Sequence, residues 1–419
     1  MKTFHSVYRY IAVLCFGICT VGLLSATASA QTTFNSGSTG ADGALVFYTP
    51  PSGRHAHAMA YDVARQQVIL FGGYGASGLD DDTWEWNNTR WTLKNPITRP
   101  SARYEHAMVY DSTRQVMVLF GGIGTSGDFN DTWEYDGTTW TLKTPANSPD
   151  PRYSHTMVYD AARQRVVLFG GLSSSTGYGN DTWEYDGTTW TQRTPATTPS
   201  VRTDHAMVYD AARQRVVLFS GNNNVNDTWE YDGTTWTQRT PATSPTARSA
   251  HAMVYDAARQ RVVLFGGYNS SGVYVNDTWE YDGTTWTQRT PATSPPERYS
   301  HTMAYDSIHQ AIVLFGGCCN VFNDTWLWNG TTWSAPVQTQ TSPVIGMSTR
   351  PDGIWHYTTI DIPAGVKVSF KSNPANTPVV WLATGAVHIA GEIDLDGVNA
   401  SYGSVDPGNE APGGPGFLG

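Results

Sequence analysis

The chain has 419 residues, of which 40% are hydrophobic and 15% charged, so it is long enough to bury a substantial core. Asp and Glu number 36 against 26 Lys and Arg, which gives a net charge of −10 at pH 7. Such an acidic chain without a basic patch excludes nucleic acid and anionic membrane surfaces as expected partners.

The first 30 residues are typical of an export signal. Lys2 and Arg9 give a basic start, residues 11–24 are mostly apolar, and Ala-Ser-Ala at 28–30 fits a cleavage site. The apolar run is short for a membrane span, although an uncleaved anchor is the alternative interpretation. We therefore expect cleavage before Gln31 and a mature protein without a membrane span, secreted or exported to the cell surface.

Cysteine usage points away from a disulfide scaffold. Cleavage removes Cys15 and Cys19 and leaves only the adjacent pair Cys318-Cys319, whose redox state the sequence leaves open. Stability must then come from buried apolar surface. Residues 31–42 are expected to form a disordered N-terminal segment.

A motif of Arg-x-x-His, followed by a small residue and Met, recurs six times at intervals of 46 to 50 residues. Each copy continues to Tyr-Asp, then to an apolar run ending in Phe-Gly-Gly, and then to Asp-Thr-Trp and a second Trp. The fourth copy has Phe-Ser-Gly at 219–221 instead. The repeated residues are Arg54, Arg103, Arg152, Arg202, Arg248 and Arg298, with His57, His106, His155, His205, His251 and His301.

Each repeat predicts four short strands. The first is His-Ala-Met-Val-Tyr, and the second, Arg-Val-Val-Leu-Phe, is continuously apolar, which indicates burial on both faces. Thr-Trp-Glu-Tyr alternates, and an Asp-Gly pair of the type needed in a two-residue hairpin leads to Thr-Thr-Trp-Thr-Gln-Arg. Four antiparallel strands about every 50 residues predict an all-β, six-bladed propeller over residues 43–336.

The double glycine after the second strand and the Trp pair on the third and fourth strands resemble the kelch repeat. The resemblance covers all six copies, and it implies that the first strand is innermost and that ligands bind at the variable-loop face. Galactose-oxidase-like propellers share this repeat, but their copper site needs a singular Tyr, His and Cys constellation. No such set stands out, so no catalytic residue, metal or cofactor is predicted.

Ring closure has two possible forms. Residues 42–50 match the fourth-strand pattern, although the sixth repeat already has its own fourth strand at 331–336. The extra N-terminal strand either closes the ring or packs outside it.

The repeated Arg and His are expected to be structural. A metal needs ligands that converge on one point at about 2.1 Å, whereas equivalent atoms of six blades spread around an axis. We expect each His to tie its own blade by hydrogen bonds and each Arg to pair within the fold, with lining of a binding face as the alternative for Arg.

Function is expected where the copies differ, namely in the loops between strands two and three and in the two residues between Arg and His. Alternating strand direction places both sets at one end of the ring. We expect a monomeric module that binds a protein or glycan there. A carbohydrate-active or oxidase-type propeller enzyme and a purely structural surface or matrix protein are the alternatives. The candidate ligand-binding residues are Tyr74, Tyr104, Glu105, Phe129, Tyr153, Tyr178, Asp204, Tyr268, Tyr274, Tyr299 and Phe322.

Composition changes after the sixth repeat. Residues 337–350, rich in Thr, Ser, Pro and Gln, are expected to be a linker, and 351–419 a β-rich segment. Its short strands, at 355–362, 366–370, 379–382, 387–389 and 393–395, resemble the opening turns of a right-handed β-helix. The Pro- and Gly-rich end suggests that the natural product continues.

Overall fold

The computed structural model describes residues 50–222, 225–318 and 321–335, together with the backbone of short strands at 44–46 and between 344 and 394. It divides into one unit of Pro51–Val337 and another of Met1–Pro50 with Gln338–Gly419. The predicted signal and the predicted disordered segment at 31–42 lie outside the described residues. Within the described ranges no helix is long and apolar enough to cross a membrane.

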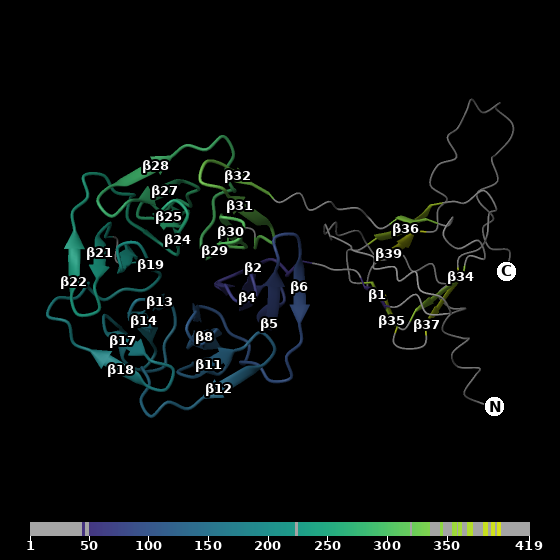
Figure 1. Cartoon of the computed structure of the whole chain (residues 1–419), viewed down its shortest axis with the longest axis horizontal. Coiled ribbons are helices and arrows are strands. Elements are labelled where there is room, and N and C mark those ends of the chain that lie inside the picture. The colour runs from purple at the N-terminus through teal and green to yellow at the C-terminus, as the bar shows by residue number, and fades with distance from the viewer. Residues whose placement is uncertain are drawn as a thin grey trace. The chain divides into compact units, whose positions relative to one another are not determined.

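Residues 51–337 form a ring of six antiparallel sheets, of which five have four strands and the first has the additional short strand β2 (Figure 1). Blade one contains β2 (Arg54–His55), β3 (Ala58–Asp62), β4 (Gln67–Gly75), β5 (Gly78–Trp86) and β6 (Trp91–Lys94). Blade two contains β7 (Ala107–Asp111), β8 (Val116–Phe120), β11 (Thr132–Tyr135) and β12 (Trp140–Lys143). Blade three contains β13 (Thr156–Asp160), β14 (Arg165–Phe169), β17 (Thr182–Tyr185) and β18 (Trp190–Arg193).

The other three blades repeat this order. Blade four contains β19 (Ala206–Asp210), β20 (Arg215–Phe219), β21 (Thr228–Tyr231) and β22 (Trp236–Arg239). Blade five contains β24 (Ala252–Asp256), β25 (Arg261–Phe265), β27 (Thr278–Tyr281) and β28 (Trp286–Arg289). Blade six contains β29 (Thr302–Asp306), β30 (Ala311–Phe315), β31 (Thr325–Trp328) and β32 (Trp333–Ser334). The predicted all-β, six-bladed propeller is confirmed, and the first strands contact one another around the axis.

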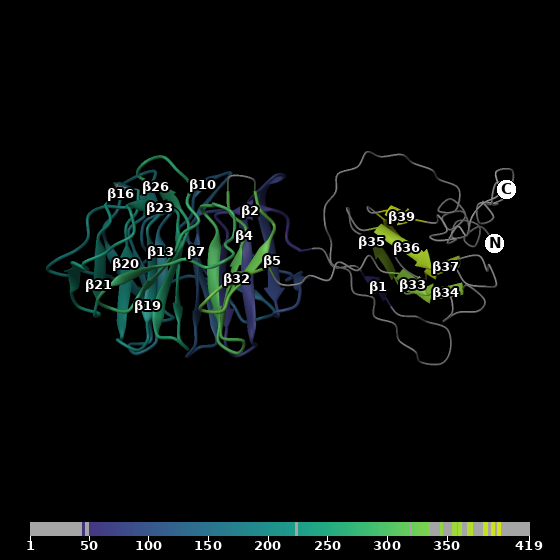
Figure 2. The same cartoon turned by 90° about the horizontal axis from the view of Figure 1, so that it is seen from above.

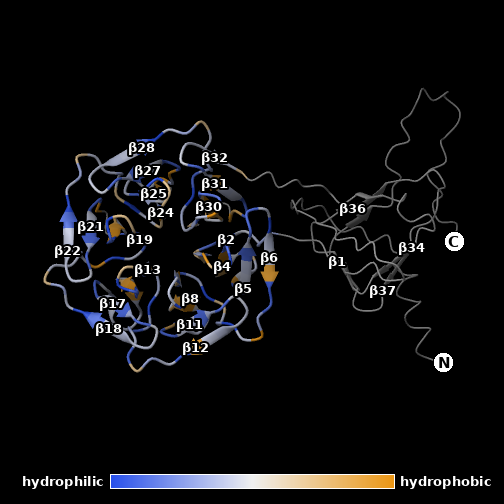
Figure 3. Cartoon of the chain, viewed as in Figure 1, coloured by the Kyte–Doolittle hydropathy of each residue, from blue (hydrophilic) through white to orange (hydrophobic). Residues whose placement is uncertain are grey.

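The core lies between neighbouring blades, and Figure 3 shows the apolar colouring concentrated on the inner strands. One cluster, for example, joins Ile69 and Phe71 of blade one to Met117, Leu119 and Trp140 of blade two. All five side chains are inaccessible or nearly so, as expected for a strand buried on both faces. Each such aliphatic or aromatic side chain stabilises the fold by about 1.5–3 kcal/mol.

The ring closes through side chains and loops, without exchange of strands between blades. Every fourth-strand Trp donates its indole N–H to a Thr hydroxyl of the preceding blade, and the bond from Trp91 to Thr325, at 3.0 Å, joins blade one to blade six. The extra N-terminal strand is not part of this closure. Strand β1 (Ala44–Val46) pairs in parallel with β35 (Thr359–Ile362) of the other unit, so the propeller unit starts at Pro51 rather than at residue 43.

The described strands of the second unit form three parallel sheets, called ladders below. They join β33 (Val344–Gly346), β36 (Lys367–Lys371) and β39 (Glu392–Asp394); β34 (Ile354–Tyr357) and β37 (Val380–Ala383); and β1, β35 and β38 (Val387–Ile389). Strand β33 lies within the expected linker, and the single strand expected at 355–362 is divided into β34 and β35. Consecutive strands along the chain enter different ladders, which gives the unit a coiled topology.

Candidate ligand-binding face

The structure brings the two variable segments of each repeat together at one end of the ring. In blade one, Arg54 and His55 pair with Gly75 and Tyr74, just after the double glycine. Isolated bridges join Tyr104 to Ile123, Tyr153 to Leu172 and Tyr299 to Cys318 in other blades. In the side view the short strands β10 (Gly127–Asp128), β16 (Gly177–Tyr178), β23 (Arg248–Ser249) and β26 (Tyr268–Asn269) all lie at this end (Figure 2). We call it the variable-loop end.

Below this end, each repeated Arg is buried and bound inside its own blade. Arg103 donates from Nη1 and Nη2 to the two carboxylate oxygens of Asp131, at 2.6 and 2.8 Å. Its Nη1 also bonds the carbonyl of Gly121 at 2.9 Å, and its Nε bonds the carbonyl of Ser101 at 2.9 Å. Asp131 in turn accepts the indole N–H of Trp133 at 2.7 Å. The Arg therefore joins the strand start, the double glycine and the third strand.

The repeated His side chains contact the preceding blade, so the expectation that each ties its own blade is wrong. His106 packs edge-on against Phe71, with ring centroids 5.5 Å apart, and the other five repeat this contact. His205 also hydrogen-bonds the hydroxyl of Thr156 on the preceding blade, at 2.7 Å. The reason is geometric: side chains at the start of an innermost strand project between blades, where the neighbour's second strand ends.

These histidines are held neutral. Burial, followed by the charge of the neighbouring Arg, lowers the pKa of all six and brings those of His155 and His251 to about 3. A neutral imidazole is the form that packs against an aromatic ring without an uncompensated buried charge. No group of three or more His, Cys, Asp or Glu among the described residues is arranged to hold a metal ion.

The residue before each repeated His forms a closed ring of backbone hydrogen bonds around the axis. Each of these residues donates its N–H to the carbonyl of the equivalent residue in the preceding blade, at 2.8–3.2 Å, and Ala56 completes the circle by bonding Ser300. All six have φ between 52° and 56°, although none is glycine. They are Ala56, Glu105, Ser154, Asp204, Ala250 and Ser300. A left-handed backbone costs roughly 1–2 kcal/mol per residue, which the inter-blade hydrogen bonds help to offset.

Three neighbouring residues of this ring, Glu105, Ser154 and Asp204, bring two carboxyl groups together around one hydroxyl, and we call them the acidic trio. The Ser154 hydroxyl lies 2.5 Å from Oε2 of Glu105 and 3.1 Å from Oδ1 of Asp204. A hydroxyl has one hydrogen, so the two contacts can both be hydrogen bonds only when one carboxyl carries a proton. Burial raises the pKa of both Glu105 and Asp204, which favours this shared proton.

Aromatic side chains form two clusters at the same end. The blade five–six cluster consists of Tyr268, Tyr274 and Tyr299, in which Tyr274 and Tyr299 stack with centroids 5.1 Å apart and planes at 11°. Tyr268 and Tyr274 are 42% and 41% exposed, so the cluster faces solvent. The blade one–two cluster consists of His55, Tyr74 and Tyr104, with successive centroids 5.6 and 5.7 Å apart.

Comparison with known proteins agrees with this architecture. The model of the Attractin/LZTR1 beta-propeller matches residues 79–228 and 128–282, and that of the KLHDC2/KLHL20/DRC7 Kelch-repeats domain matches residues 234–350. The chain is a kelch-repeat β-propeller protein. A solved structure titled "Structure of YjhT" is similar in fold, with a TM-score of 0.53 at 14% identity, covering 68% of this chain and 98% of that one. No curated protein matches in sequence.

Not every aromatic candidate of this kelch propeller faces solvent. Phe129 and Phe322 are half-buried, and each ring lies 4.1 Å from the guanidinium carbon of its own blade's Arg, Arg103 or Arg298. Their rings are therefore engaged within the blades. Tyr178 is exposed, whereas Tyr104, Tyr153 and Tyr299 are half-buried. His55 belongs to an exposed cluster but was missed, because it occupies a position where other copies have Tyr, Thr or Ser.

The opposite end of the kelch propeller carries turns in which many polar groups bond to one another. Asp136 accepts hydrogen bonds from the backbone of Thr138 and Thr139, each at 2.8 Å, and from the Thr138 hydroxyl at 2.7 Å. Arg163 bonds Asp160 within one turn and also Glu184 of the same blade. Nη2 of Arg114, Arg163 and Arg213 has no hydrogen-bond partner within the described residues, but this feature recurs in three successive blades. Because the turns are nearly identical, this end offers little that distinguishes one blade from another.

Proposed function

We propose that this protein is an exported binding module that recognises a protein ligand through the variable-loop end of its kelch propeller. Kelch propellers generally mediate protein interactions. The observation that carries the proposal is the gathering of two aromatic clusters and the acidic trio at one end of the ring. The opposite end has only turns that are nearly identical from blade to blade. Exposed aromatic side chains are frequent anchors of protein interfaces.

The chemistry of this end selects a ligand with basic and apolar side chains. Glu105 and Asp204 lie close to the axis, half-buried, where a Lys or Arg side chain would compensate the charge of the ionised trio. The Tyr faces on either side can hold aliphatic or aromatic groups, and also a cation over the ring. The expected ligand is therefore a protein segment in which a basic residue is flanked by apolar ones.

Display of random peptides, selected on the exported protein, tests this proposal. We expect enrichment of basic and apolar sequences, and we expect Tyr104→Ala, Tyr153→Ala and Tyr299→Ala each to weaken binding, by about 2 kcal/mol at a central anchor. Asp136→Ala is the matched control, because it removes a turn cap at the opposite end. It should lower stability by about 0.5–2 kcal/mol and leave affinity unchanged. Loss of binding in the Asp136 variant alone would place the ligand at the other end.

Export is proposed from the first 30 residues, whose basic start, apolar run and Ala-Ser-Ala sequence fit a cleaved signal. The intact mass of the protein recovered outside the cytoplasm should correspond to a start at Gln31. A mature exported product that retains residues 1–30 would contradict the proposal.

We also propose that the second unit is the start of a right-handed β-helix. Paired residues in its three ladders lie 25 (Ile345 to Phe370), 26 (Ile354 to Val380) and 27 (Ile360 to Val387) positions apart. A near-constant interval in three parallel ladders is what successive turns of such a coil produce.

A further inference from the structure

The outer edge of the repeated Arg is covered in five of the six blades, each time by a side chain of the same blade. In blades one, four and five, Nη2 of the Arg donates a hydrogen bond to a side-chain hydroxyl. The acceptors are the hydroxyls of Ser52 at 3.0 Å, Ser200 at 3.0 Å and Thr246 at 3.2 Å. In blades two and six the ring of Phe129 or Phe322 covers the guanidinium. These are alternative solutions to one packing problem, since the Arg sits at the same place in every blade.

Blade three departs from this pattern at two positions. Asp150 stands two residues before Arg152, where Ser or Thr stands in four other blades and Pro in the sixth. Gly179 stands two residues before the paired aspartate Asp181, where the other blades have Asp, Phe or Val. The Asp150 main-chain oxygen accepts from Nε of Arg152 at 3.1 Å, but its carboxylate makes no ion pair with Arg152 among the described contacts. Both replacements uncover the same Arg.

Backbone conformation does not explain the glycine. The N–H of Gly179 bonds the carbonyl of Gly171 at 2.8 Å, as the N–H of Phe129 bonds the carbonyl of Gly122 at 2.8 Å. Gly179 does not have the positive φ found at the double glycines, so its backbone conformation does not require glycine. An added Cβ would lie 2.9 Å from Oδ1 of Asp181, so that carboxylate would have to shift to admit a side chain. What the glycine provides is space above Arg152.

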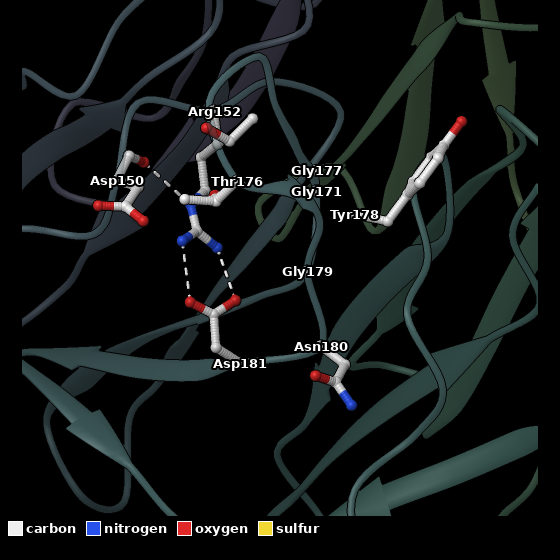
Figure 4. A pocket seen from close by; sticks show the side chains of 10 residues that line it. Asp150, Arg152, Gly171, Thr176, Gly177, Tyr178, Gly179, Asn180 and Asp181 are labelled. Carbon is white, nitrogen blue, oxygen red and sulfur yellow. Dashed lines mark hydrogen bonds and ion pairs between the residues drawn. The ribbon is translucent and has the colours of Figure 1, made fainter.

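That space is a pocket of about 240 Å³, and Figure 4 shows the Arg152–Asp181 pair among the side chains that line it. It is smaller than typical drug-sized ligand sites and suits one small ring. Arg152 is 5% exposed here, whereas Arg103 and Arg298 under their Phe rings are fully buried. The other polar lining groups include Asp150, Ser173 and Thr176.

One hydrogen-bond donor of Arg152 has no acceptor in the pocket. Nε and Nη1 are used by Asp150, Gly170 and Asp181, and Nη2 bonds Asp181 Oδ2 at 2.8 Å. A guanidinium has five N–H groups, so the second Nη2 hydrogen has no acceptor within the part of the chain that the structure describes. Blades one, four and five supply a hydroxyl oxygen for this hydrogen, and blades two and six cover the guanidinium with a Phe ring. Blade three has neither the hydroxyl nor the ring, and a pocket lies there instead.

We propose that this blade-three pocket binds one neutral monosaccharide residue. One sugar hydroxyl accepts the second Nη2 hydrogen of Arg152, an adjacent hydroxyl donates to the carboxylate of Asp150, and the ring lies over the guanidinium as Phe129 does in blade two. Two carboxylates, those of Asp150 and Asp181, disfavour an anion. The hydroxyls and amide of the lining favour a polyhydroxylated ring over a purely aromatic one. This site is separate from the Tyr clusters and goes beyond the proposed protein ligand.

Saturation-transfer NMR on the exported protein with glucose, galactose, mannose and N-acetylglucosamine, each at millimolar concentration, tests the proposal. At least one sugar should show transfer and a saturable titration. Gly179→Phe rebuilds the covering of blades two and six and should abolish that signal. Asp150→Ser supplies the hydroxyl of blades one and four and should weaken binding at least tenfold.

Val275→Phe makes the equivalent change in blade five and is the matched control, which should leave sugar binding unchanged. Tyr274→Ala should also leave it unchanged, so that failure of this site and failure of the protein-binding proposal can be told apart. Absence of transfer from every sugar, or its persistence in Gly179→Phe, would overturn the inference. Binding of p-cresol without binding of any sugar would assign the pocket to an aromatic side chain instead. If Gly179→Phe does not fold, Asp150→Ser decides the question.

Discussion

At the scale of the residue, each repeated Arg connects three parts of its blade through hydrogen bonds. Arg103 is fully buried and bonds both oxygens of Asp131, and the same bidentate pair recurs in all six repeats. Such a planar, bidentate contact depends on guanidinium geometry, which the point charge of Lys does not reproduce. The variable-loop end thus lies above six ion pairs in which the Arg is buried and the Asp is partly exposed.

We predict that Arg103→Lys lowers the free energy of unfolding by about 1–3 kcal/mol, because Lys keeps the charge but cannot make the bidentate contact with the half-buried carboxylate of Asp131, nor the other hydrogen bonds of the buried guanidinium. Equilibrium unfolding in urea measures the change. Arg99→Lys is the control, since Arg99 is largely exposed and its pairing with Asp81 is on the surface, so the loss there should be small. Equal losses in the two variants would show that burial of the pair does not matter.

At the scale of the element, blades are joined by contacts that cross from one sheet to the next. The His at the start of each first strand meets the Phe at the end of the preceding blade's second strand, and the fourth-strand Trp packs against that same Phe. Because the His is neutral when it packs, we expect protonation in acid to weaken these junctions. The expected acid sensitivity is repeated six times around the ring.

We predict that stability falls as the pH is lowered from 6.5 towards 3. A histidine titrates near 6.5 when unfolded, but the folded pKa of His155 and His251 is about 3, so the unfolded state binds more protons between these values. The stabilisation is complete above 6.5 and is lost by about 1.4 kcal/mol per pH unit for each such His. Melting temperature measured between pH 7.5 and 4.5 should decline steeply, and a flat profile would refute the prediction.

Carboxyl groups also contribute to the pH dependence of stability in this experiment. Although burial opposes it, hydrogen bonds from Arg152 and Arg248 lower the pKa of Asp181 and Asp277, so these pairs add to the loss only below about pH 4. Glu105 and Asp204 have raised pKa values and work in the opposite direction. His155→Gln, which removes one titrating group, should reduce the slope between pH 6.5 and 4.5, and this variant assigns the effect to histidine.

At the scale of the whole molecule, the chain leaves one unit, completes the propeller and returns. Strand β1 comes before the ring and pairs with β35, which comes after it. The propeller segment is continuous and closes through its own side chains, as the bond from Trp91 to Thr325 illustrates. The second unit is discontinuous, since strands before and after the propeller contribute to its ladders.

We predict that residues 51–337 expressed alone melt cooperatively, whereas 351–419 do not. The shorter piece lacks β1 and β33, each of which pairs with a strand that it retains, and a coil of parallel strands needs stacked neighbours to bury its faces. Differential scanning calorimetry of the two pieces provides the measurement. A sharp transition in 351–419 would mean that its few ladders suffice.

The sequence by itself determined the number of blades, the four strands of each and the end at which the copies differ. Those features follow from period, apolar patterning and turn residues, all of which are local. The tertiary structure alone decided that His106 contacts Phe71 rather than its own blade, that non-glycine residues such as Glu105 adopt a positive φ, and that β1 pairs with β35. It also decided that Phe129 covers Arg103 while Gly179 leaves Arg152 open. These outcomes depend on groups from different strands or blades meeting in space, and no local pattern encodes which neighbour a side chain will face.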